Sequence, residues 1–260
     1  MTKLDHVVVN TLRNMDRAFQ CFAALGFTLT PRGYHSLGSI NHLMMTQGAY
    51  LELVGVPEQG LQRRDVLESP YGLNGLVLNS VDAVADFARL ERAGLPAKPP
   101  DTFSRPVEIN GEMLEARFRT VRFPPEVFPA GRLYLCEHLT PDLVWRPEWL
   151  SHPNGFQAIG GLVIESPTAA ADAERCAAVC AAQAERDPRG WLVMLGDVSI
   201  RFVEGAVARF ATVELVFDGL DEIGRRAASL DGAVWRWNDS SREASLTISD
   251  LGLTLTCRSN

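Results

Sequence analysis

A short apolar run followed by a helix-like pattern recurs along the chain. Residues 4–11 (LDHVVVNT) repeat the order of apolar and polar positions found in residues 73–80 (LNGLVLNS), 69 residues later. After each run, apolar residues three or four positions apart predict an amphipathic helix. These are Met15, Phe19, Phe22 and Leu25 in the first copy, and Val84, Phe87, Leu90 and Ala93 in the second. Gly26 and Gly94 follow where a left-handed C-terminal cap is expected.

The pattern appears twice more in the second half of the chain. Residues 159–166 precede an Ala-rich helix over about 168–184, and residues 211–217 precede a helix over about 220–230. Strand-like runs follow each helix, and the clearest are 40–46, 49–56, 114–123, 131–138, 191–195, 198–203, 244–249 and 252–257. We therefore predict an α+β protein of four βαβββ-type modules, each of about 65 residues.

The modules are expected to pair. One helix covers only one face of a small sheet, so two modules must combine to bury the other face. The segment 141–154 separates the two pairs, with three prolines and with Trp145 and Trp149, which indicate a packed connector. We therefore expect one unit at 1–150 and a second at 151–260, which could still pack as one body.

Composition excludes several functional classes. The 260 residues carry 25 Lys+Arg against 32 Asp+Glu, a net charge of −7, which argues against a nucleic-acid binder. No apolar run is long enough to span a membrane, and the first residues do not resemble a signal peptide. Five cysteines are few and odd in number. These features favour a reduced, cytoplasmic protein with no membrane or nucleic-acid partner.

The repeat, the opening LDHVVV and the later Tyr50-Leu51-Glu52-Leu53 resemble the vicinal-oxygen-chelate superfamily of glyoxalases, extradiol dioxygenases and bleomycin-resistance proteins. The stretches 35–43 (HSLGSINHL), 138–149 (HLTPDLVWRPEW) and 152–155 (HPNG) resemble its glyoxalase-like domain proteins. The resemblance implies paired, cup-shaped mixed sheets with helices on the outside. It also implies a cavity inside the cup for a metal or a ligand.

His6 is the first candidate metal ligand. A strand's period of two places it on one face with Leu4, Val8 and Asn10. A buried imidazole at that position requires either a metal or a hydrogen bond. The resemblance favours the metal, because superfamily ligands come from the first strand of a module.

Glu52 is the second candidate. It shares a strand face with Tyr50, which we take as a candidate substrate contact, and with Val54. A carboxylate between apolar neighbours is costly unless it is paired. It is therefore either a salt bridge at the sheet rim or a metal ligand opposite His6, and the resemblance places a ligand Glu on this last strand of the module.

The second module departs from the superfamily pattern. Gly75 stands at the position of His6 and has no side chain that can coordinate. Glu137 and His138 remain on the last strand, and because they are adjacent only one can face the cavity. Alignment of the leading glycines instead places Leu135 at the Glu52 position, so the alternatives stay open.

Whether His138 or Glu137 faces the cavity decides which kind of metal the site would suit. His6, Glu52 and His138 would suit a divalent transition metal (Fe, Mn, Zn, Ni or Co) with open coordination positions. Glu137 in place of His138 would make a more oxygen-rich site.

Three further polar residues precede Glu52. His42 is the candidate catalytic base if it points inward, and otherwise it caps a sheet edge. Asn41 points to the opposite face and is a candidate substrate contact. His35 lies in a turn expected at the mouth of the cup, where it could contact substrate or simply be exposed.

The second half carries Gly161 and Val213 at the positions of His6. We interpret it as a degenerate pair without a metal site, which could cover the first half, shape the pocket or form a homodimer. The favoured function is a metal-dependent glyoxalase-like enzyme of lyase, isomerase or dioxygenase type. The alternative is a metal-free protein that sequesters a small molecule, favoured by the vacant positions at Gly75, Gly161 and Val213.

Overall fold

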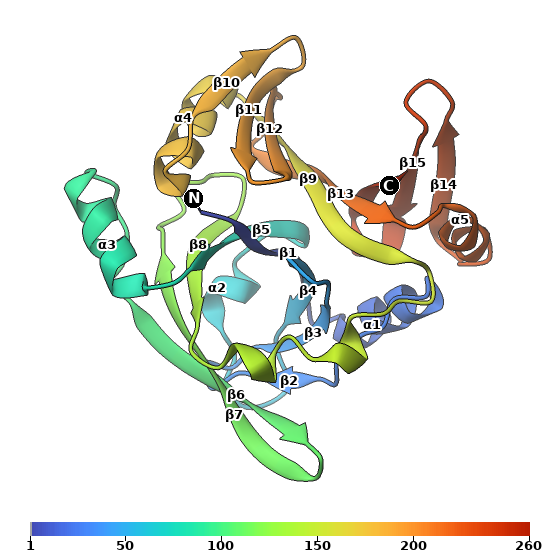
Figure 1. Cartoon of the computed structure of the whole chain (residues 1–260), viewed down its shortest axis with the longest axis horizontal. Coiled ribbons are helices and arrows are strands. Elements are labelled where there is room, and N and C mark those ends of the chain that lie inside the picture. The colour runs from blue at the N-terminus through green and yellow to red at the C-terminus, as the bar shows by residue number, and fades with distance from the viewer. Residues whose placement is uncertain (1) are drawn as a thin grey trace.

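The computed structural model describes residues 2–260 as an α+β protein of two eight-stranded mixed sheets (Figure 1). The elements of the first half are β1 (Leu4–Leu12), α1 (Met15–Ala24), β2 (Gly33–Tyr34), β3 (Ile40–Met44), β4 (Tyr50–Gly55), α2 (Arg64–Leu67), β5 (Gly72–Ser80), α3 (Ala83–Arg92), β6 (Asp101–Ile109), β7 (Glu112–Arg122) and β8 (Arg132–His138). Those of the second half are β9 (Phe156–Ser166), α4 (Ala169–Cys180), β10 (Ala184–Asp187), β11 (Gly190–Leu195), β12 (Val198–Glu204), β13 (Arg209–Phe217), α5 (Asp221–Ala228), β14 (Ala233–Asn238), β15 (Glu243–Ile248) and β16 (Leu253–Ser259). Short 3-10 helices lie at Pro141–Leu143, Pro147–Trp149 and Ser249–Leu251.

The predicted four βαβββ modules are confirmed. Each half contains two modules that join through their first strands, which are antiparallel: β1 with β5, and β9 with β13. Within a module the first and last strands are parallel, as in β1 with β4 and β5 with β8. Both sheets therefore have the same strand order, β2-β3-β4-β1-β5-β8-β7-β6 and β10-β11-β12-β9-β13-β16-β15-β14.

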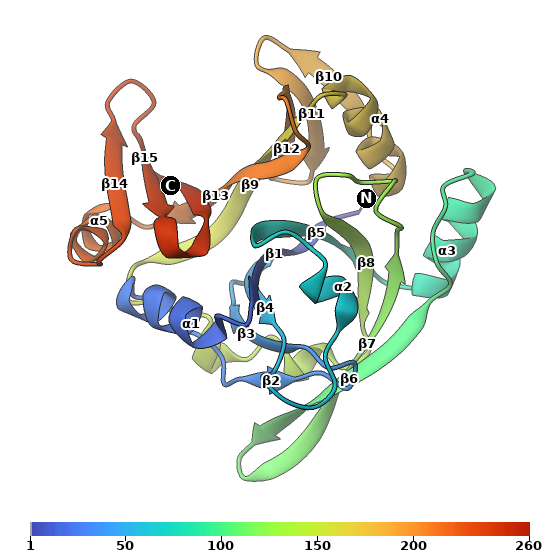
Figure 2. The same cartoon turned by 180° about the vertical axis from the view of Figure 1, so that it is seen from behind.

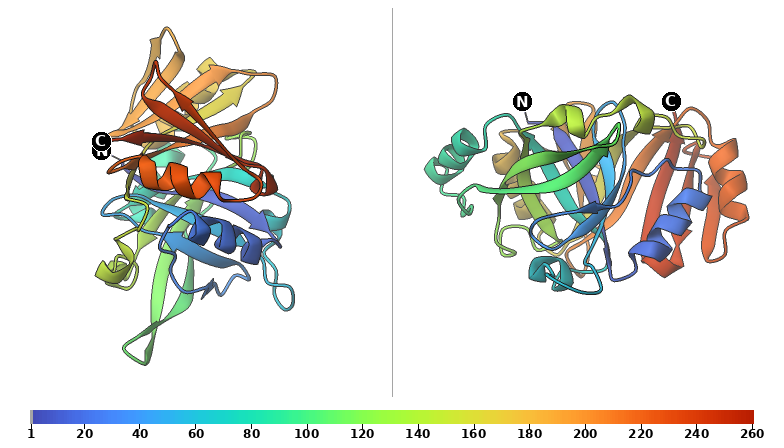
Figure 3. Two further views of the ribbon diagram at one scale, coloured as in Figure 1. Left: turned by 90° about the vertical axis from the view of Figure 1, so that its right-hand side faces the viewer. Right: turned by 90° about the horizontal axis from the view of Figure 1, so that it is seen from below.

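The two sheets differ in curvature. The first curls into a near-ring, whereas the second forms a wider arch (Figures 1 and 2). The ring approaches closure after β2, where the amide of Ser36 donates to the carbonyl of Ser104 on β6 over 2.9 Å. Helices α1, α3, α4 and α5 lie outside the sheets (Figure 3). The inner face of the first sheet is thus left to line a cavity.

One apolar core joins the halves. The outer faces of central strands from both sheets contribute to a single cluster, in which Val7, Leu76 and Val213 have no exposed surface. Burial of this kind is worth about 1.5–3 kcal/mol for each large aliphatic side chain, so the halves stabilise one another. The assignment of residues 1–150 and 151–260 to separate domains stays a prediction.

The connector between the sheets is packed, as its tryptophans indicated. Trp145 donates from Nε1 to the carbonyl of Gly48 over 3.1 Å. His152 Nδ1 accepts from the amide of Thr28 at 3.0 Å, and its Nε2 donates to the carbonyl of Met45 at 2.7 Å. No helix in the described part of the chain is long and apolar enough to cross a membrane.

Local geometry confirms two predictions and changes a third. Gly26 and Gly94 have φ of +84° and +70°, the left-handed conformation expected of C-terminal caps. The strand period fails at the start of β1, because the pairing with β5 shifts between Leu4 and His6. Leu4 consequently joins the outer core instead of sharing the inner face with His6.

Candidate functional site

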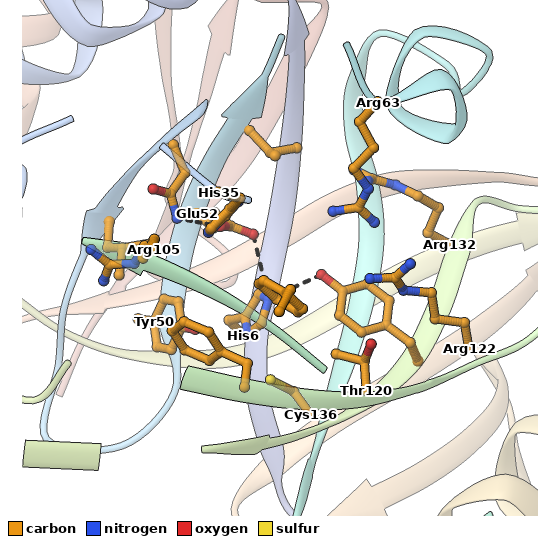
Figure 4. A pocket seen from close by; sticks show the side chains of 16 residues that line it. His6, His35, Tyr50, Glu52, Arg63, Arg105, Thr120, Arg122, Arg132 and Cys136 are labelled. Atoms are coloured by element: carbon orange, nitrogen blue, oxygen red, sulfur yellow. Dashed lines mark hydrogen bonds and ion pairs between the residues drawn. The ribbon is translucent and has the colours of Figure 1, made fainter. Parts of the chain in front are cut away.

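The first sheet encloses a cavity lined by side chains of β1, β3, β4, β6, β7 and β8, together with the segments before β3 and α2 (Figure 4). The space beside its lining atoms, including the part that is open to solvent, is about 490 Å³. Only about 30 Å³ of it can hold the centre of a water molecule, which is room for about two or three waters. A ligand that fits without rearrangement must therefore be small.

His6 lies at the centre of this lining (Figure 4). Its Nδ1 donates to Oδ1 of Asp5 over 2.5 Å, and its ring stacks on Tyr50 with centroids 4.6 Å apart. The other ring nitrogen, Nε2, lies 3.4 Å from Oε2 of Glu52 and 3.2 Å from the hydroxyl of Tyr134. Burial alone would lower the pKa of His6, but the carboxylates of Asp5 and Glu52 raise it to about 9.

Glu52 is held from both sides. Asn41 donates from Nδ2 to Oε1 over 2.7 Å, and His6 faces Oε2. Burial would raise the pKa of Glu52, but His6, His35 and Asn41 together lower it to about 2. The carboxylate is therefore ionised at neutral pH although only 6% of the residue is exposed.

The structure identifies Tyr134 as the second-module counterpart of Glu52. Val8 pairs with Glu52 across β1 and β4, and Val77, 69 residues after Val8, pairs with Tyr134 across β5 and β8. The glycine-based alignment, which placed Leu135 there, is wrong because Leu135 faces the outer core. Burial raises the pKa of Tyr134, so its hydroxyl keeps its proton at neutral pH.

Gly75 has no side chain that could coordinate a metal, and the fold gives a reason for the glycine. A Cβ at residue 75 would lie 2.7 Å from Cβ of Val8 and 2.9 Å from its Cγ2. The space that a ligand side chain would need is therefore occupied by β1.

Glu137 and His138 do not join His6 and Glu52. Glu137 points outward, where its Oε2 accepts from the amide of Ala83 at 3.0 Å and from Arg119 at 3.3 Å. Its predicted role as a metal ligand in the cavity conflicts with this position at the start of α3.

His138 points to the inner side but outside the cavity, with Nε2 3.0 Å from Oδ2 of Asp5. Asp5 thus lies between two imidazoles, and they hold the pKa of its carboxyl well below its usual range against the effect of burial. In residues 2–260, Asp5, Cys136 and His138 form a group whose potential ligand atoms lie within 4.8 Å of one another. This group is a second place where a metal could bind.

His35, Asn41 and Tyr50 line the cavity as expected for substrate contacts. The Nδ1 of His35 lies 2.8 Å from Oγ of Ser39, and burial lowers the pKa of His35 to about 3, so this imidazole is neutral.

His42 lies on the opposite face of β3, contrary to its predicted role as an inward-facing base. Its Nδ1 donates to the carbonyl of Thr30 over 2.8 Å, and its ring packs on Phe19 of α1 with centroids 4.7 Å apart. Burial lowers its pKa.

Sequence reasoning missed Asp5 and four cavity arginines, Arg63, Arg105, Arg122 and Arg132. The β1 irregularity that turns Asp5 toward His6 leaves no mark in the apolar pattern. A weak signal did exist for Arg122, because Phe118, Thr120 and Arg122 alternate along β7 and all three line the cavity.

A sequence model described as "Glyoxalase-like domain" matches residues 4–180, from β1 through α4. The chain belongs to this glyoxalase-like domain family. A search of curated protein sequences gives no match.

Solved structures resemble this glyoxalase-like protein over its whole length. A hypothetical protein from Staphylococcus aureus has a TM-score of 0.72 and 14% identity, with 100% of both chains covered. The Mn(II)-bound glyoxalase from Novosphingobium aromaticivorans has a TM-score of 0.59 and 11% identity, covering 100% of this chain and 83% of the other. A mutant of 4-hydroxymandelate synthase from Streptomyces coelicolor has a TM-score of 0.55 and 13% identity, covering 99% and 92%. These likenesses show a shared fold.

The donors around His6 fit a divalent metal with open positions. Ligand atoms at about 2.0–2.2 Å from one ion lie about 3.0–3.5 Å apart, and His6 Nε2 and Glu52 Oε2 are separated by 3.4 Å. The contact from Asp5 to the other ring nitrogen is the arrangement by which a carboxylate orients a metal-bound histidine. The glyoxalase-like site therefore offers two strong ligands, where the resemblance implied a larger set.

Proposed function

We propose that this glyoxalase-like protein is a metal-dependent enzyme that acts on a small oxygenated substrate in the cavity of its first sheet. The observation that carries the proposal is the convergence of His6 Nε2 and Glu52 Oε2 at 3.4 Å, each held from behind by Asp5 or Asn41. A divalent transition metal held there would act as a Lewis acid on adjacent substrate oxygens. The family resemblance supports a reaction of lyase, isomerase or dioxygenase type.

The chain's own residues would position the substrate and hold its protons. The Tyr134 hydroxyl, 3.2 Å from His6 Nε2, keeps its proton and can donate to an oxygen that gains negative charge. His35 is neutral, so near neutral pH it can form a hydrogen bond with the substrate without bringing a positive charge into the cavity. His42 takes no part, because it lies behind β3.

Metal content is the direct test. Protein purified without chelator should contain about one equivalent of a transition metal, measured by elemental analysis. Changing His6→Ala or Glu52→Gln should weaken metal binding by at least about 100-fold, since each removes one of two strong ligands. Glu137→Gln is the matched control, because Glu137 bonds outside the cavity, and it should keep the metal.

The Asp5, Cys136 and His138 group supplies the competing outcome. Cys136→Ser should leave metal content unchanged under the proposal. If Cys136→Ser loses the metal while His6→Ala keeps it, the assignment to His6 and Glu52 is wrong.

A metal-free binding protein is the second candidate function. It is favoured by Gly75 and Tyr134, which replace ligands at two of the expected positions. Protein without metal whose ligand binding is insensitive to chelator would select this candidate over the enzyme.

A further inference from the structure

Buried polar atoms without a partner gather in the cavity. In the described chain, seven buried side-chain nitrogen or oxygen atoms lack a hydrogen bond, and six of them belong to cavity residues. They are Asn41 Oδ1, Arg105 Nε, Arg105 Nη2, Thr120 Oγ1, Arg122 Nε and Arg132 Nη2. Buried polar groups are nearly always bonded, and five of these six atoms are able to donate, so this concentration marks a place where a ligand could accept hydrogen bonds.

Arg105 is the clearest case. Only 3% of this residue is exposed, and two of its guanidinium nitrogens have no partner. The guanidinium lies 6.0 Å from the ring centroid of Phe118, with no carboxylate bonded to it. Gly33 permits this placement, since a Cβ there would lie 3.0 Å from Cδ of Arg105 and 2.2 Å from Oδ1 of Asn41.

Arg122 and Arg132 repeat the arrangement on neighbouring strands. Arg122 lies 6.0 Å from the ring centroid of Phe103, and Arg132 bonds from Nε only to the neutral side chain of Asn74 at 2.9 Å. Arg63 is paired, with two bonds of 2.8 Å to Asp65. Figure 4 shows Arg63, Arg122 and Arg132 together on one side of His6, with Arg105 on the other.

Arginines of the second sheet bond carboxylate groups, which Arg105, Arg122 and Arg132 do not. In the second sheet, Arg201 bonds Asp187 and Arg258 bonds Glu214, each over 2.6 Å. Among the sixteen residues that line the first cavity, four are arginines and one, Glu52, is a carboxylate. The cavity is therefore cationic in a chain whose net charge is −7, and a bound anion would supply the carboxylate or phosphate partner that Arg105, Arg122 and Arg132 lack.

We propose that the cavity binds a small dianion, with Arg122 and Arg132 donating to one carboxylate or phosphate group and Arg105 donating to a second acidic group. This inference rests on the proposed function, because it makes the substrate a compact oxygenated acid whose oxygens lie beside His6 and Glu52. Guanidinium groups bind both carboxylate and phosphate through paired N–H donors.

The test measures binding of malonate and of inorganic phosphate by calorimetry and thermal shift, at constant ionic strength. Malonamide, the uncharged analogue of malonate, is the control ligand. We expect malonate or phosphate to bind and to raise Tm at millimolar concentration, and malonamide to do neither. Preference between the two anions identifies the acidic group of the substrate.

Variants locate the binding. Arg105→Met and Arg122→Met should each weaken anion binding about 10- to 100-fold, because each removes charged donors from the site. Arg64→Met is the matched control, since the Arg64 side chain is 87% exposed on α2, and it should bind as the wild type does. Absence of anion binding, equal binding of malonamide, or wild-type affinity in both variants would overturn the inference.

The same titrations in chelator-treated and metal-loaded protein separate the two proposals. Anion binding without any metal site leaves this inference standing and refutes the metalloenzyme. A bound metal without anion binding refutes this inference and leaves the metalloenzyme proposal standing.

Discussion

Replacing Arg105 with methionine should stabilise the ligand-free protein. The residue is 3% exposed, burial lowers its pKa, and its Nε and Nη2 have no partner. Each unsatisfied buried donor costs about 1–3 kcal/mol. Two or three waters can enter the cavity and relieve part of this cost, so we take about 1–2 kcal/mol as the net penalty. Methionine replaces the guanidinium near the Phe118 ring with an apolar side chain of similar length.

The assay is thermal and urea unfolding in a buffer without phosphate or carboxylates. For a chain of this length, about 1–2 kcal/mol corresponds to a rise in Tm of about 2–8 °C. The gain should shrink or reverse when malonate is added, since the anion binds the wild type more tightly and stabilises it more. A fall in Tm of similar size for Arg105→Met, with or without anion, would refute the reasoning and assign Arg105 a structural role.

Three further predictions follow from the same contacts. Gly75→Ala should lower stability by about 1–3 kcal/mol in urea unfolding, because its Cβ would lie 2.7 Å from the Cβ of Val8, and the loss should be smaller in a Val8→Gly background, which lacks that atom. In metal-free protein the raised pKa of His6, about 9 against 6.5 unfolded, adds stability below pH 6.5 that is lost as pH rises to 9. This loss of up to about 3 kcal/mol should be absent in His6→Asn, and an equal slope in that variant would contradict it. His42→Ala should leave metal content and anion binding unchanged. It should cost about 1 kcal/mol of stability in unfolding experiments run alongside the wild type. Loss of metal would show that His42 supports the site.

The repeat made most of the fold predictable, and the strands it missed share one property. The βαβββ order, the helix caps at Gly26 and Gly94 and the two inner strands after each helix followed from apolar periodicity. The unpredicted strands β2, β6, β10 and β14 are all at sheet edges. Edge strands are half-exposed and polar, as in β6, where two of nine residues are buried, so they lack the apolar signal.

The part of the candidate site that could be predicted lies on the two neighbouring strands β1 and β4. The inward-facing His6 and Glu52 follow from the strand period together with the family resemblance. The inward direction of Asn41 and the outward direction of His42 depended on register, which a one-residue shift reverses. Arg105 lies on the unpredicted strand β6, and its position beside Gly33 of β2 depends on closure of the ring, which local sequence does not encode.

Anomalous X-ray diffraction from crystals of metal-loaded protein is the most direct test of the proposed metal site. The metalloenzyme proposal predicts one ion bonded to Nε2 of His6 and to the carboxylate of Glu52, inside the first sheet. An ion bonded instead to Asp5, Cys136 and His138, or no ion in the cavity, would contradict it.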